Sequence, residues 1–168
     1  MVIFVFGGVR SSKSIFAESL LPKKMQKAYI ATMINNDSEN NQRINNHKSR
    51  RDESWTLIEQ TSNLEHIKSF NEDYVLLDCL TNLLANELFF MNKKPLDAIF
   101  SILNGILMVK KNSKELVIVS NNIFEDGIDY FDETNMFIRT LGLLHQKVVE
   151  ISDIVYETEY GLNRKLKG

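Results

Sequence analysis

The chain begins with M-V-I-F-V-F-G-G-V-R-S-S-K-S, residues 1–14, in which an apolar run leads directly into a segment of glycine, serine and lysine. Residues 7–14 follow the phosphate-binding pattern G-x-x-x-x-G-K-[ST] at Gly7, Lys13 and Ser14, but Ser12 stands where the pattern has its second glycine. In this motif, backbone N–H groups of the loop and the N-terminus of the next helix bind phosphate oxygens. The stretch therefore predicts a buried strand, a phosphate-binding loop and a helix, with a nucleotide as the ligand.

The side chains of this loop indicate its chemistry. Lys13 is expected to contact the β- and γ-phosphates, and the Ser14 hydroxyl is expected to bind Mg²⁺. A glycine is usual before the lysine because a Cβ disfavours some of the backbone angles that the loop needs, so Ser12 is expected to be strained by about 1–3 kcal/mol. That strain weakens the motif without excluding a nucleotide. The alternative is an ordinary glycine-rich turn between a strand and a helix.

The composition is that of one globular domain spanning residues 1–168. The chain is 43% hydrophobic and 25% charged, with a formal net charge of −2, so neither nucleic acid nor a membrane surface is an expected partner. Its single cysteine, Cys79, excludes an internal disulfide and fits a reducing compartment. Because the first residues enter a strand at once, no secretory signal is expected. These observations predict a cytoplasmic protein.

Short apolar runs alternate with helical patterns along the chain. Runs without period-two alternation are typical of parallel strands covered on both faces. They occur at 2–6, 28–31, 75–77 and 116–119, with further strands expected near 154–156 and 161–166 and helices near 95–111 and 137–148. The alternation predicts a doubly wound α/β domain: a mostly parallel sheet with helices on both faces and a ligand at the carboxyl ends of the strands. Residues 35–41 are expected to form a loop.

Two further positions lie at expected strand ends. Asp78 follows the apolar run 74–77, where a nucleotide-binding fold usually orders Mg²⁺. The alternative for Asp78 is a carboxylate that caps a helix starting at Leu80. Asn121 and Asn122 follow the next expected strand, and they either face the ligand or form a turn.

A cationic segment at 43–51 contains Arg43, His47, Lys48 and Arg51. Such a concentration of cations suits a second phosphate or base site. The alternative is a solvated basic face of a helix. Five phenylalanines elsewhere are expected in the core or at subunit contacts: Phe89, Phe90, Phe100, Phe124 and Phe131.

Together these motifs resemble the adenosylcobinamide kinase/adenosylcobinamide-phosphate guanylyltransferase family of cobalamin biosynthesis. Residues 7–14 are similar to its G-G-x-R-S-G-K-S loop, and residues 29–32 are similar to its second strand. The spacing within 43–59 follows its R-I-x-x-H-K-x-x-R-x-x-x-W-x-x-x-E block, and residues 78–81 follow its [DE]-C-[LI]-T segment. The resemblance covers essentially the whole chain and continues at Asn86, Asn121, Gly127, Phe137, Gly142, Gln146 and Gly161-Leu162.

The resemblance implies a RecA-like P-loop fold, a homotrimer and two reactions that use ATP or GTP with Mg²⁺. In the first, a nucleoside triphosphate phosphorylates the aminopropanol hydroxyl of adenosylcobinamide. In the second, GMP from GTP passes through a covalent histidine to the phosphorylated corrinoid, giving adenosylcobinamide-GDP. By position, the catalytic residues would be His47, Lys13 and Asp78, and the metal ligands Ser14 and Asp78. The nucleotide-binding residues would be Gly7, Gly8, Val9, Arg10, Ser11, Ser12, Lys13, Ser14, Thr32, Met33, Ile34, Lys48, Arg51, Glu59 and Asp78.

Four positions depart from the family pattern. Asn46 stands where the family has the histidine that carries GMP, and an amide cannot act as that nucleophile. The other departures are Ser12 for glycine, Asn122 for glutamate and His145 for asparagine. Three functions therefore stay open: a bifunctional enzyme with His47 as the nucleophile, a kinase alone, or a nucleotide- or corrinoid-binding module without catalysis.

Overall fold

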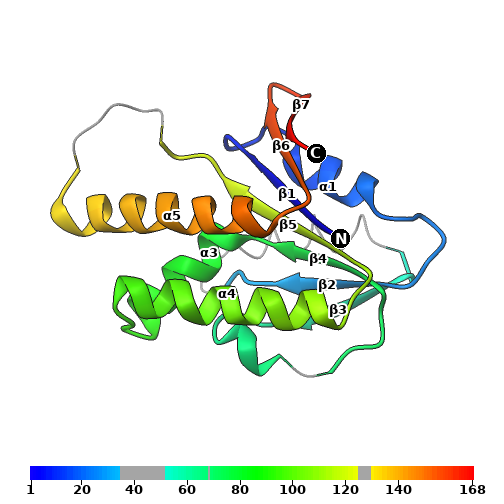
Figure 1. Cartoon of the computed structure of the whole chain (residues 1–168), viewed down its shortest axis with the longest axis horizontal. Helices are drawn as coiled ribbons and strands as arrows, with labels where there is room; N and C mark the ends of the chain where they lie inside the picture. Colours follow the sequence, from blue (N-terminus) through cyan, green and yellow to red (C-terminus); the bar gives the residue numbers. More distant parts are fainter. Residues whose placement is uncertain (35–51, 68, 125–129) are drawn as a thin grey trace.

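The computed structural model describes residues 1–34, 52–67, 69–124 and 130–168 of the chain. The described residues form a seven-stranded sheet with the strand order β3-β2-β4-β5-β1-β6-β7 (Figure 1). Strands β1 to β6 are parallel, and β7 pairs antiparallel with β6, which confirms the predicted mostly parallel sheet. The strand bounds are β1 Val2–Gly7, β2 Lys27–Ala31, β3 Trp55–Glu59, β4 Tyr74–Asp78, β5 Glu115–Asn121, β6 Ile154–Glu159 and β7 Leu162–Lys167.

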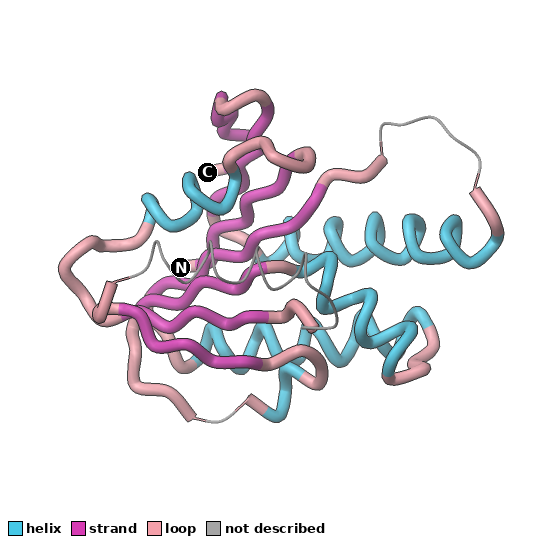
Figure 2. The backbone as a smooth tube through the Cα atoms, turned by 180° about the vertical axis from the view of Figure 1, so that it is seen from behind, coloured by secondary structure: helices cyan, strands magenta, loops and turns pink. Residues whose placement is uncertain are grey.

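Helices cover both faces of this sheet, as predicted (Figure 2). Helix α1 packs on one face, and α3, α4 and α5 pack on the other. A 3-10 turn, η1, and a π-helical turn, η2, extend the second layer. No helix in the described part of the chain has the length and apolar character needed to cross a membrane. The bounds are α1 Lys13–Leu20, η1 Leu64–His66, α3 Leu80–Ala85, η2 Asn86–Phe90, α4 Pro95–Lys111 and α5 Asp132–Ile151.

The two faces have separate hydrophobic cores because the central strands are buried on both sides. Val2 and Phe4 of β1 belong to the core under α3, α4 and α5, whereas Ile3 and Val5 belong to the core under α1. Successive side chains of a strand point to opposite faces of the sheet. A continuous apolar run therefore supplies both cores, which explains why these runs lack alternation.

Strand β3 was not among the expected strands. The structure pairs Trp55–Glu59 with β2 at the edge of the sheet. Trp55 and Ile58 are partly buried and the other three residues are exposed, so no apolar run marks the strand. Its position depends on pairing with β2, which is a non-local contact.

The five phenylalanines expected in the core or at subunit contacts are all exposed. The expectation of a core position is therefore wrong for Phe89, Phe90, Phe100, Phe124 and Phe131. Whether any of these rings meets another subunit stays a prediction.

Candidate nucleotide-binding site

The loop between β1 and α1 contains two residues with left-handed backbone angles. Arg10 has a φ of 60° and Ser12 a φ of 69°. The Ser11 N–H donates to Gly8 O at 3.3 Å, and the Phe16 N–H donates to Ser12 O at 3.0 Å, so the helix follows the loop directly. The left-handed region favours glycine. The expectation of a strained Ser12 is therefore confirmed.

Gly7 is needed because of close packing. A Cβ on Gly7 would collide with the backbone carbonyl of Thr158, its register partner on β6. The carbonyl of Gly7 also accepts the Asn122 N–H at 2.8 Å, which ties the end of β5 to the loop. The start of the loop is therefore held between two strand ends.

The Ser11 hydroxyl fits a phosphate ligand. Ser11 is buried, and its Oγ has no hydrogen-bond partner among the residues that the structure describes. A buried polar group without a partner costs about 1–3 kcal/mol. A phosphate oxygen in the loop would accept a hydrogen bond from this hydroxyl.

Lys13 begins α1, and its side chain is buried under the loop. Its Nζ donates to Gly8 O at 3.1 Å. Burial lowers the pKa of Lys13 below its ordinary value, while Cys79 and Asp78 act in the opposite direction. The structure thus brings Lys13 and Asp78, two predicted catalytic residues, into one electrostatic environment.

Asp78 is the last residue of β4, and Tyr29 on β2 orients its carboxylate. The Tyr29 hydroxyl donates to Asp78 Oδ2 at 3.1 Å. Strand β5 lies between β4 and β1, so two strand spacings separate Asp78 from the end of β1 by about 10 Å. The residue at the N-cap of α3 is Cys79, so Asp78 directly precedes the cap position.

Thr32 supports the turn after β2. Its buried Oγ1 donates to Cys79 O and accepts the Cys79 N–H, both at 2.8 Å. Its carbonyl accepts a hydrogen bond from Asn86 Nδ2, also at 2.8 Å. These bonds join the ends of β2 and β4. Contact of Thr32, Met33 and Ile34 with a nucleotide stays a prediction.

A buried polar network that the sequence did not reveal lies at the end of β5. Ser120 Oγ is 2.7 Å from His145 Nε2 and 3.0 Å from Thr81 Oγ1. Thr81 Oγ1 also accepts the Asn121 N–H at 2.9 Å. Burial lowers the pKa of His145 to about 4, so its ring is neutral at pH 7. The departure from the family pattern at His145 was the one sequence signal for this network.

The sheet register places several predicted site residues at one edge. Asn121 pairs with Gly7, and both Asp78 and Glu59 pair with Ala31. Asp78 in turn pairs with Val119 of β5, two residues before Asn121, so β5 and β1 extend further than β4. These residues therefore lie at the carboxyl ends of five strands, as expected for a ligand at this edge of the sheet. Glu59 is on the outer strand β3, four strands away from Gly7 on β1.

The basic segment of the sequence lies outside the described residues. This holds for the predicted site residues His47, Lys48 and Arg51, and also for Arg43 and Asn46. The expected loop at 35–41 and Gly127 lie outside them as well. Their roles stay predictions.

A family model for cobinamide kinase / cobinamide phosphate guanyltransferase matches residues 3–166. The chain belongs to this family. The match spans the phosphate loop, Asp78 and the end of β5. The recognition made from the sequence motifs is confirmed.

Two relatives align with this chain over nearly their whole length. The bifunctional adenosylcobalamin biosynthesis protein CobU of Escherichia coli (strain K12) is 29% identical over 184 residues, which cover 99% of this chain and 100% of the relative. The bifunctional adenosylcobalamin biosynthesis protein CobP of Pseudomonas aeruginosa is 30% identical over 168 residues, which cover 98% of this chain and 96% of the relative.

A solved structure supports the fold alone. A KaiC-like protein from Pyrococcus horikoshii superposes with a TM-score of 0.50 and 9% identity, covering 93% of this chain and 71% of that chain. The P-loop, RecA-like fold that the sequence predicted is confirmed.

Proposed function

We propose that this protein is a bifunctional enzyme of cobalamin biosynthesis that phosphorylates adenosylcobinamide and then transfers GMP from GTP to the product. The observation that carries the proposal is the convergence of Lys13 and Asp78 beside a phosphate loop whose buried Ser11 hydroxyl lacks a partner among the described residues. The family match over 3–166 supplies the substrate class.

In the kinase step, the substrate hydroxyl oxygen forms a bond to the γ-phosphorus, and the bond from that phosphorus to the β,γ-bridging oxygen breaks. The nucleoside diphosphate leaves, and the hydroxyl proton passes to solvent. Lys13 and the loop N–H groups hold the phosphate oxygens as negative charge moves toward the leaving group. ATP or GTP serves as the donor.

Mg²⁺, when bound, neutralises phosphate charge. Ser14 at the start of α1 and Asp78 are the residues that would hold it. No group of three or more histidine, cysteine, aspartate or glutamate side chains gathers within 1–34, 52–67, 69–124 and 130–168. A site that relies on few protein ligands fits Mg²⁺, which usually keeps waters and phosphate oxygens in its shell.

In the guanylyl step, we propose that His47 attacks the α-phosphorus of GTP, forms a phosphorus–nitrogen bond and releases pyrophosphate. The phosphate of the phosphorylated corrinoid then attacks that phosphorus and displaces His47. Lys48, Arg51 and Glu59 would frame this region. The alternative is a kinase alone, or a protein that binds its ligands without turnover, because Asn46 replaces the family histidine.

We further propose a homotrimer in the cytoplasm, without nucleic-acid or membrane partners. The outer face of α4 supports an interface between copies. Leu96, Phe100 and Leu107 are exposed there at helical spacing, so they form an apolar stripe.

The test is mass spectrometry of protein and corrinoid after incubation with adenosylcobinamide, Mg²⁺ and GTP. A GMP adduct that is lost in His47→Ala, together with adenosylcobinamide-GDP, supports the bifunctional enzyme. Phosphorylated cobinamide without the GDP product indicates the kinase alone. Unchanged protein and corrinoid, with Lys13→Met as the inactive control, would overturn both catalytic proposals.

A further inference from the structure

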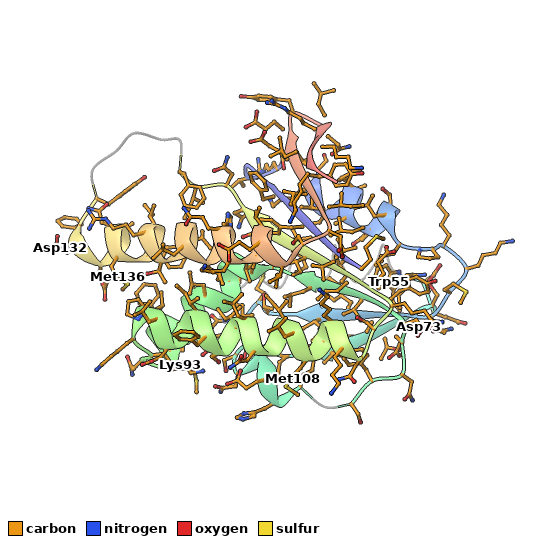
Figure 3. All side chains as sticks on the ribbon, in the orientation of Figure 1. Trp55, Asp73, Lys93, Met108, Asp132 and Met136 are labelled. Carbon is orange, nitrogen blue, oxygen red and sulfur yellow. The ribbon has the colours of Figure 1, made fainter. Side chains whose placement is uncertain are left out.

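Exposed apolar side chains lie on η2 and just after it, just before α5, and after the end of β5. We call the exposed Phe89, Phe90, Met91, Phe124 and Phe131, together with the partly buried Phe137 beside Phe89, the aromatic surface. Phe90 is 60% exposed and Phe131 is 91% exposed. The Phe89 and Phe137 rings lie 5.9 Å apart, which joins η2 to α5. Figure 3 shows the labelled neighbours Lys93, Asp132 and Met136 at this end of the molecule, opposite Trp55 and Asp73.

Phe124 of the aromatic surface lies close to the phosphate loop. The Phe124 N–H donates to Asn122 Oδ1 at 3.3 Å, and the Asn122 N–H in turn donates to Gly7 O. On the other side, the Phe124 ring lies beside Gly142 of α5. Gly142 is one and a half helical turns from Phe137. Phe124 therefore lies between the phosphate loop and α5, the helix that also carries Phe137.

An ion pair between Glu87 and Lys93 fixes the position of η2 and of the aromatic side chains on it. Glu87 is fully buried; its Oε1 accepts the Asn63 N–H at 2.5 Å, and its Oε2 lies 2.5 Å from Lys93 Nζ. Lys93 Nζ also donates to Asn63 Oδ1 and Ser101 Oγ, each at 2.8 Å. The charge of Lys93 is therefore neutralised, and the turn that presents Phe89, Phe90 and Met91 is anchored. A preorganised apolar surface suits a rigid apolar ligand.

We propose that the aromatic surface binds the corrin ring of the cobinamide substrate, an inference that rests on the proposed function. The hydroxyl that receives the phosphate sits on a side arm of a broad, flat macrocycle. When that hydroxyl reaches the phosphate loop, the macrocycle must lie on protein surface next to the loop. The exposed phenylalanine rings on this edge can pack against the face of the corrin macrocycle. Such contacts are favourable because aromatic side chains bury large apolar areas.

A second copy of this chain is the competing occupant. The stripe on α4, with Leu96, Phe100 and Leu107, is a separate apolar face and already accounts for contacts between copies under the proposed function. The aromatic surface differs from that stripe because it adjoins the phosphate loop through Asn122 and Phe124. This position favours the substrate.

The experiment uses a matched pair of methionines at opposite edges of the sheet. Met91 is 44% exposed on the aromatic surface, and Met25 is 46% exposed in the loop before β2, at the amino ends of the strands. Cobinamide binding to wild type, Met91→Ser, Met25→Ser and Phe90→Ser is measured by equilibrium dialysis, with the corrinoid followed by its visible absorbance. GTP binding and molar mass by light scattering are measured on the same samples.

We expect cobinamide to bind about tenfold more weakly to Phe90→Ser and about threefold more weakly to Met91→Ser, because each loses buried apolar area. Met25→Ser should match wild type, and GTP binding should be unchanged in all variants. Wild-type affinity in Phe90→Ser and Met91→Ser would overturn the inference, and a changed molar mass with it would assign the surface to a second copy. Failure of wild type to bind cobinamide would instead overturn the proposed function.

Discussion

Two buried lysines at opposite edges of the sheet have different surroundings. Lys27 is the first residue of β2, at the amino edge, and its Nζ lies 5.1 Å from the centre of the Trp55 ring. Its Nζ also donates to four oxygens at 2.8–3.2 Å, which are the carbonyls of Pro22, Lys23 and Met25 and the hydroxyl of Ser54.

Lys13 lies at the carboxyl edge and, within the described part of the chain, donates to Gly8 O alone. A buried ammonium group has three N–H donors and is costly when they are unmet. Lys27 is satisfied by the fold itself, whereas Lys13 keeps donors for phosphate oxygens. The difference separates a structural lysine from a ligand-binding lysine.

The largest effect is expected from Lys13→Met. Kinase turnover should fall by about 10²–10³-fold, because the charge that stabilises the transferred phosphate is lost. The free energy of unfolding should stay the same or rise, because a poorly bonded buried charge is removed. Turnover by chromatography of the corrinoid and urea unfolding measure the two quantities. A large loss of stability would contradict the distinction between the lysines.

His145 is a third buried basic residue, and it is neutral at pH 7. Its folded pKa of about 4 lies below the ordinary value, so the unfolded chain takes up the proton first as pH falls. Stability should therefore be complete above about pH 6.5 and should decline by about 3 kcal/mol as pH falls to 4. Urea unfolding across this range should show the decline in wild type and a flatter profile in His145→Asn. Equal profiles would show that another group is responsible.

Lys27→Met tests the structural lysine. The substitution keeps the aliphatic stem but leaves the surrounding oxygens without their donor, so we expect a loss of about 2 kcal/mol of stability. Turnover per folded molecule should match wild type, since the residue lies at the edge away from the phosphate loop. Activity lost without a loss of stability would be the contrary outcome.

Tyr29→Phe tests whether the Tyr29 hydroxyl positions the Asp78 carboxylate. Removing the hydroxyl takes away the 3.1 Å hydrogen bond that Tyr29 donates to Asp78 Oδ2, so the carboxylate is less well placed. We expect the Mg²⁺ concentration for half-maximal kinase activity to rise about 3–10-fold, with little change in the KM for cobinamide. An unchanged Mg²⁺ requirement would show that Tyr29 does not position a ligand of the metal.

Ser12→Gly should have the smallest effect. It replaces a residue with a φ of 69° by one that adopts this angle freely, which should raise stability by about 1 kcal/mol. Nucleotide binding should tighten slightly or stay the same. Thermal unfolding with and without GTP measures both effects, and a destabilised variant would show that the serine hydroxyl makes a compensating contact.

Much of the carboxyl edge was predictable because its signals are local. Each signal can be read from residues that are close together in the chain. The signals are the apolar run before Gly7, the spacing from Gly7 to Lys13 and the acid after the run 74–77. The strain at Ser12 was predictable for the same reason. The network of Thr81, Ser120 and His145 was not, because its members come from three segments and no local pattern shows that they meet.

The sequence by itself determined the strands that supply two cores, the phosphate loop and the family of the protein. Each depends on residues that are neighbours in the chain and therefore carry a pattern. The tertiary structure alone decided the pairing of Trp55–Glu59 with β2, the different partners of Lys13 and Lys27, and the anchoring of η2 by Glu87 and Lys93. Those features depend on which distant groups meet after folding, and burial then sets the cost of every hydrogen bond they make or lack.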